Sequence, residues 1–142
     1  MEPREVHGRA APTSLQESFR SVLIDTTQLA LERTISGAAQ RHEALAANLA
    51  NANTPGYQRV DVDFHGALAS AVSRGEESQQ ALHSLSFSPA RDASAGAVRA
   101  DGSTVDVDSE SAKLAANALE HQAAVQVAHA RIGILKAAMG AA

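Results

Sequence analysis

The chain has 142 residues, of which 12 are basic and 16 acidic, and its formal net charge is -4. It contains no cysteine, which excludes disulfides and thiolate metal sites, and it has no basic run of the kind that binds nucleic acid. Hydrophobic residues make up 44% of the chain and aromatic residues only 3%, and many of the apolar residues are alanine. Because alanine buries little surface, helices of this composition are expected to need neighbours.

Residues 1–13 contain two prolines, a glycine and mixed charges, a composition typical of a mobile N-terminal tail. This start lacks the apolar core of a cleaved signal peptide, and the sequence has no run of about 20 apolar residues that could cross a membrane. We therefore expect any export of the chain to use a route without a cleaved signal peptide.

A helical pattern begins at Ser14 and predicts an N-terminal helical region over residues 14–53. Its weak points are Gly37, which costs about 1 kcal/mol against alanine inside a helix, and the polar residues 25–27, where a bend or break is possible. Steps of four and three alternate along one face, which is the spacing of a heptad seam that packs against another helix. The seam residues are Leu31, Ile35, Ala38, His42, Leu45, Leu49 and Ala52.

A helix end and a turn follow. Asparagine is a weak helix former because its amide competes for backbone groups, so Asn48, Asn51 and Asn53 indicate a helix end held by side-chain hydrogen bonds. Pro55 suits the second position of a turn and Gly56 supplies the positive φ that a type II turn requires next. The sequence therefore predicts a type II turn over residues 54–57.

Residues 54–108 are predicted to form a small, loop-rich middle region. A short helical patch runs from about residue 66 to residue 74, and the strand-like pieces 85–87 and 104–107 allow a β-hairpin. The acidic cluster at 101–108 does not fit a calcium loop, because alanine and arginine stand where the first two ligands belong. A turn at Asp101-Gly102, followed by a helix cap, is the prediction here.

The C-terminal region, residues 109–142, is predicted as a second long helix, capped by Asp106 or Asp108 and carrying Glu110 in its first turn. Its seam alternates in the same way and comprises Leu114, Ala118, His121, Val125, Ala128, Ile132, Leu135 and Met139. The predicted fold class is thus mainly α, with long N- and C-terminal helices that pack as a coiled-coil-like pair around one structural unit.

Two seam positions carry histidine, which raises the possibility of a metal or proton site between the helices. Neither His42 nor His121 has a second ligand at helical spacing, since the residues four positions on are Ala46 and Val125. Packing or register marking is therefore the favoured interpretation. No catalytic, phosphate-binding or dinucleotide motif occurs, so we expect no enzyme activity, no cofactor and no small-molecule substrate.

The string Asn48-Leu49-Ala50-Asn51 with Asn53-Thr54-Pro55-Gly56-Tyr57 resembles the signature of bacterial flagellar rod and hook axial proteins. The residues Asp61-Val62-Asp63-Phe64 that follow are most similar to those of the FlgB family of the proximal rod. An independent match lies in residues 105–123, which resemble the C-terminal segment of that family. The chain departs from the family in a somewhat longer N-terminal segment and in His121, where an aromatic residue is common.

The resemblance implies a structural subunit of the flagellar basal body that polymerises into the torque-transmitting rod. It implies as partners other copies of the chain, other rod subunits, the inner-membrane ring with its adaptor, and the flagellar type III export apparatus. The implied location is the rod, across the periplasm. One alternative is another axial protein of the FlgC type, and a second is a cytoplasmic helical adaptor or export chaperone. An enzyme is the third alternative.

Overall fold

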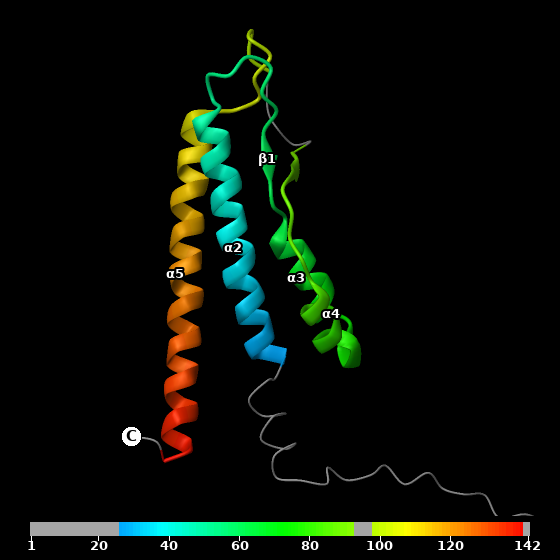
Figure 1. The fold of residues 1–142 in the computed structure, drawn as a ribbon, viewed down its shortest axis with the longest axis vertical. Helices are drawn as coiled ribbons and strands as arrows, with labels where there is room; N and C mark the ends of the chain where they lie inside the picture. The colour runs from blue at the N-terminus through cyan, green and yellow to red at the C-terminus, as the bar shows by residue number, and fades with distance from the viewer. Residues whose placement is uncertain (1–25, 93–97, 141–142) are drawn as a thin grey trace, which may run out of the picture.

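The computed structural model describes residues 26–92 and 98–140. Two long helices, α2 (Thr26–Ala50) and α5 (Val107–Ala138), lie side by side and make the most extensive contact in the described part of the chain (Figure 1). This arrangement confirms a mainly helical fold in which the N- and C-terminal helices pack together. The predicted tail at 1–13 and the helical pattern over 14–25 lie outside the described residues.

The middle region lies along the side of α2 that faces away from α5 (Figure 1). Its elements in chain order are β1 (Val60–Asp61), α3 (Phe64–Val72), the 3₁₀ turn η1 (Gly75–Glu77), α4 (Ser78–Ser84) and β2 (Ala90–Arg91). The two strands are antiparallel, with Val60 opposite Arg91 and Asp61 opposite Ala90. Helix α3 is the short helix predicted over 66–74, whereas α4 was not predicted.

The strand predictions for 85–87 and 104–107 are wrong. Leu85 and Phe87 belong to an extended segment whose side chains pack against the apolar core, and Val107 is the first residue of α5. The short ladder forms elsewhere because pairing depends on which backbone lies alongside, and strand propensity is a weak guide to that. The two paired strands are also separated by α3 and α4, so they do not form a tight hairpin.

In the described part of the chain, two small clusters of buried apolar residues both include residues of α2. One contains Ala38, Ala44, Val62 and Phe64, and the other contains Leu29, Ala71 and Leu82. Both clusters lie between α2 and the middle region, and α2 also packs along α5, so α2 is buried on two sides although its sequence pattern predicted one seam. Small side chains make this possible because they let three layers approach one another closely.

Gly37 is buried at the closest approach between α2 and α3. A Cβ atom at this position would lie 2.6 Å from Phe64 Cβ and 2.7 Å from Phe64 Cγ, which is closer than carbon atoms can pack. The glycine that the sequence marked as a weak point of the helix is therefore the residue that lets the Phe64 ring reach the backbone of α2.

The buried side of α5 lies one residue earlier than predicted at several positions. Its buried residues are Glu110, Asn117, Ala124 and Ala128. Leu114, His121, Val125 and Leu135 are half-buried, whereas Ala118 is exposed and Ile132 and Met139 have exposed fractions of 41% and 56%. On α2, Leu31, Ile35 and Leu49 are half-buried, Ala38 and Leu45 are buried, and His42 is exposed; Ala52, two residues after the helix ends, is buried.

Within the described ranges, no helix is both long and apolar enough to cross a bilayer.

Candidate functional site

Asn48, the first asparagine of the motif, is completely buried at the end of α2 and joins three segments. Its Nδ2 donates to the Val60 carbonyl oxygen at 2.6 Å and to Glu110 Oε2 at 2.8 Å. Its Oδ1 accepts from the Val60 N–H at 3.0 Å and from the Tyr57 hydroxyl at 3.3 Å. An amide side chain that both donates to and accepts from one residue mimics a strand partner, so Asn48 fastens β1 to α2 and to the start of α5.

Glu110 is the charged centre of this junction, with an exposed fraction of 1%. Its Oε1 accepts from Arg59 Nη1 at 2.9 Å and from Lys113 Nζ at 3.2 Å. Arg59 is itself 7% exposed and also pairs with Asp92, next to β2. A buried carboxylate needs compensating charge and hydrogen bonds, and this one has both. We call Asn48, Arg59, Asp92 and Glu110 the polar junction.

The turn that follows α2 is formed as predicted. Gly56 has a φ of 72°, and the Tyr57 N–H donates to the Thr54 carbonyl oxygen at 3.2 Å. A second turn lies against it, because the Gly56 N–H donates to the Asp101 carbonyl oxygen at 2.9 Å and the Gly102 N–H donates to Arg99. The acidic cluster thus forms a turn, and its Asp106 caps α5 by accepting from the N–H groups of residues 108 and 109.

Replacing Gly56 with valine is expected to destabilise the fold by about 1–3 kcal/mol, because a β-branched side chain strongly disfavours φ near +72°. Within residues 26–92 and 98–140, no atom beyond the two adjoining residues lies within 4 Å of the missing Cβ, so the cost there is backbone strain. Urea denaturation of the purified chain measures it. Gly133→Val is the control, since Gly133 lies within α5 with equally open surroundings; equal losses in the two variants would contradict the prediction.

Gly75 cannot serve as a neutral comparison. From the sequence it was expected to lie in a polar loop with no demand on its backbone, but its φ is 62°. That expectation is wrong, because the chain reverses direction between α3 and η1 and uses the left-handed region to do so.

Of the remaining motif residues, Asp63 and Phe64 hold the middle region in place and Asn51 closes the end of α2. Asp63 caps α3 by accepting from the Gly66 N–H at 3.0 Å, and Phe64 is fully buried beside Gly37. Asn51 Nδ2 donates to the Ala47 carbonyl oxygen at 2.9 Å and its Oδ1 accepts from the Thr54 hydroxyl, so it closes the end of α2. Asn53 and Pro55 are exposed.

Asp61 pairs with Arg41 of α2, whose Nε donates to Asp61 Oδ1 at 2.8 Å. Burial is the largest single influence on Asp61 and opposes its ionisation, but hydrogen bonds from Arg41 and from the Val62 N–H outweigh it. The pKa of Asp61 consequently lies below its ordinary value of 3.8. The hydrogen bond to Asp61 likewise raises the pKa of Arg41, although burial opposes this.

The lowered pKa predicts a specific acid sensitivity. A carboxylate whose pKa is lower in the folded state stabilises the fold above its unfolded pKa, and this contribution is lost as the pH falls through the folded pKa. The wild type is therefore expected to lose stability more steeply than Asp61→Asn below about pH 4. The free energies of unfolding of the two proteins are measured at several pH values from about 2 to about 6, which bracket the ordinary carboxyl pKa of about 4. Parallel curves would refute a lowered pKa for Asp61.

Sequence reasoning missed much of this site. No sequence pattern marked Arg59 or Asp92 as part of a site. Glu110 was expected only to interact favourably with the helix dipole in the first turn of its helix. Asn117 was noted only as part of the family segment, yet it is 2% exposed and its Nδ2 donates to the Ala38 carbonyl oxygen at 2.8 Å. The sequence does contain one indication of this role, because a polar residue seven positions after Glu110 lies on the same face of the helix.

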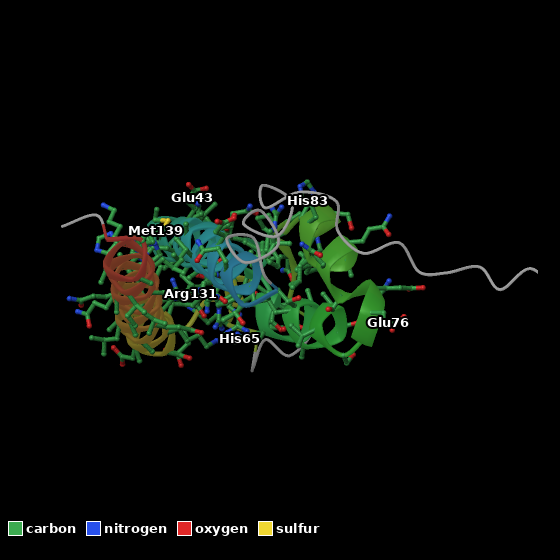
Figure 2. The ribbon with its side chains drawn as sticks, turned by 90° about the horizontal axis from the view of Figure 1, so that it is seen from below. Glu43, His65, Glu76, His83, Arg131 and Met139 are labelled. Carbon is green, nitrogen blue, oxygen red and sulfur yellow. The ribbon has the colours of Figure 1, made fainter. Side chains whose placement is uncertain are left out.

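The two seam histidines line one hollow between α2 and α5, together with Asn117 and three alanines. On the other side of the pair, His65 of α3 lies 2.6 Å from Glu120 of α5 (Figure 2). Within residues 26–92 and 98–140, no three His, Cys, Asp or Glu side chains are grouped so that they could hold a metal ion. The contacts described above join helices, turn and sheet; they make a mechanical junction.

The same segments match known proteins. Residues 29–58 match the family described as flagella basal body rod protein. The flagellar basal body rod protein FlgB of Salmonella typhimurium is 41% identical over 103 residues, which are 63% of this chain and 75% of that protein. FlgB of Escherichia coli is 36% identical over 99 residues, covering 59% of this chain and 71% of that protein.

FlgB of Aeromonas hydrophila is 32% identical over 116 residues, which are 75% of this chain and 87% of that protein. These relatives are at least 30% identical, and the chain covers more than two thirds of each. All three are named as rod proteins, as the turn motif and the C-terminal segment suggested. The chain therefore belongs to the FlgB family of flagellar basal body rod proteins.

Proposed function

We propose that this chain is a structural subunit of the proximal rod and that it polymerises through its long helices into the shaft that transmits torque. The observation that carries the proposal is a row of apolar side chains on α5 with no covering element in the described part of the chain. Leu119, Val127 and Ile134 have exposed fractions of 69%, 54% and 70%. With the exposed Ala123 and Ala130 between them, they form what we call the outer stripe.

The outer stripe follows helical spacing, with steps of four, four, three and four residues, so its members share one face. It lies on a different face from the buried side of α5, because the buried Ala124 and Ala128 each follow a stripe residue by one position and hence by about 100° around the helix. A regular apolar row on this side is typical of a surface that packs against another helix. Burying it between subunits would supply the stability that small alanine faces lack.

The polar junction suits the same role. A rod under torque needs subunits whose helices do not slide or hinge apart, and the junction ties α2, β1 and α5 together at one end of the helix pair. We propose that the chain reaches the rod through the flagellar type III export apparatus without a cleaved signal peptide. Its partners there are other copies of itself, other rod subunits, and the inner-membrane ring with its adaptor.

Substitution of Ile134 by aspartate tests the proposal. Ile134 is 70% exposed, so the change is expected to alter the free energy of unfolding by no more than about 0.5 kcal/mol while abolishing rod assembly and swimming. Val72→Asp is the matched control, because Val72 is 47% exposed at the end of α3. Swimming in soft agar and tagged subunit in purified basal bodies are the measurements.

The outcome separates the alternatives. A rod subunit appears in the basal-body fraction and loses that location in Ile134→Asp but not in Val72→Asp. An adaptor or export chaperone stays in the cytoplasm in every variant. Another axial protein of the FlgC type would also enter basal bodies, but it would not restore swimming in a strain that lacks only FlgB. Normal motility with Ile134→Asp would refute assembly through the outer stripe.

A further inference from the structure

A hollow of about 380 Å³ opens between α2 and α5 near the middle of α2. Ala38, Ala39 and Ala118 line it with small apolar groups, and His42 and His121 stand on its two helices. The polar junction and the turn contribute no residue to it. Its wall has no assigned role in the fold beyond the helix contact itself.

Asn117 also lines this hollow, and half of its amide is unsatisfied. Its Nδ2 donates to the Ala38 carbonyl oxygen, but its Oδ1 is buried and has no hydrogen-bond partner in the described part of the chain. A buried carbonyl oxygen without a donor is unfavourable, and such an atom beside an open hollow indicates a donor that arrives from outside. The hollow therefore calls for an occupant with an N–H group on an otherwise apolar surface.

The outer stripe of α5 has this chemistry. Gln126 is exposed and lies three residues after Ala123 and seven after Leu119, so its amide stands beside the apolar row. Figure 2 shows Glu43, at the rim of the hollow, projecting from the side of the helix pair away from His65.

We propose that the hollow receives the outer stripe of α5 from a second copy of this chain, with the Gln126 amide donating to Asn117 Oδ1. This inference rests on the proposed function and names the surfaces that carry it. Hollow and stripe are different surfaces of one molecule, so the contact is heterologous. A contact of this kind repeats from copy to copy without pairing off, as growth of a rod requires.

Cysteine crosslinking tests the pairing, since the natural chain has no cysteine. Ala39→Cys places a thiol at the hollow and Ala123→Cys places one on the stripe; both residues are exposed, so neither change should affect folding. Within one chain Ala39 lies on α2 at the hollow, whereas Ala123 lies on a face of α5 that does not line the hollow, so oxidation is expected to link different copies. Basal bodies purified from cells with the double variant should give a ladder of dimers, trimers and larger multimers on non-reducing gels.

Each single variant should give no dimer, and Ala39→Cys combined with Ala69→Cys on α3 is the matched control that should give no ladder. A dimer from Ala39→Cys alone would mean a symmetric contact and would overturn the inference. A missing ladder from subunits present in basal bodies would do the same, because another segment or subunit then fills the hollow. Absence of even the wild-type chain from basal bodies would instead overturn the proposed function, and the inference with it.

A second pair of variants tests the hydrogen bond without cysteines. Gln126→Leu keeps the surface apolar but removes the donor, so the amount of subunit recovered in basal bodies should fall about tenfold. Gln122→Leu, one turn earlier and also exposed, should leave it within about twofold. Equal recovery of the two variants would show that Asn117 takes no donor from Gln126 and would contradict the proposal.

Discussion

Replacing Glu110 with alanine is expected to lower the free energy of unfolding by about 3–5 kcal/mol, the usual cost of removing one partner from a buried ion pair. Glu110 is 1% exposed and accepts from Arg59, Lys113 and Asn48. Without it, the Arg59 guanidinium stays buried with Asp92 as its one remaining ion-pair partner among the described residues, and an Asn48 donor loses a partner. A domain of this size has roughly 5–15 kcal/mol to lose, so the variant should be largely unfolded at 37 °C.

Urea denaturation followed by circular dichroism measures this loss, and Glu76→Ala provides the control. Glu76 is exposed in η1, so its removal should change the free energy of unfolding by no more than about 0.5 kcal/mol. In cells, Glu110→Ala should abolish swimming because the junction no longer holds β1 and α5 against α2. A stable, motile Glu110→Ala variant would mean that the junction is dispensable.

The second large effect is expected at Gly37. Exchange of glycine for alanine inside a helix normally stabilises by about 1 kcal/mol, but here the new Cβ would lie 2.6 Å from Phe64 Cβ. The contact involves the part of Phe64 nearest its backbone, so rotation of the ring cannot relieve it and α3 must move away from α2. Overpacking of this kind costs about 1–3 kcal/mol, which should outweigh the gain in helix propensity.

Gly133→Ala supplies a control with the opposite sign. Gly133 lies inside α5, and among the described residues no atom outside its own helical turns lies within 4 Å of the position of its Cβ, so alanine there should stabilise by up to about 1 kcal/mol. The same substitution in two helices thus separates propensity from packing. Stabilisation by both variants would show that α3 and Phe64 yield freely and that Gly37 is not a tight contact.

The candidate site was only partly predictable. The turn at Pro55-Gly56 and the cap at Asp106 depend on a few consecutive residues, and the structure has both. The role of Asn48 was expected to be local, at the helix end, whereas its partners are Tyr57, Val60 and Glu110. Nothing within a short window of sequence shows that residue 48 will meet residue 110.

The sequence by itself determined the two long helices, the turn between the first helix and the middle region, and the family, because each depends on local backbone preferences or on a short string of residues. The tertiary structure alone decided the paired strands, the Gly37 contact, the junction of Arg59 with Glu110, and the side of α5 that is buried. The last case gives the physical reason. The predicted 4–3 series of α5 is the more apolar one, yet the buried side contains the polar residues Glu110 and Asn117. Their hydrogen-bond partners, Arg59 and Asn48 for Glu110 and the Ala38 carbonyl oxygen for Asn117, come from distant parts of the sequence, so only the packed chain makes this side the buried one.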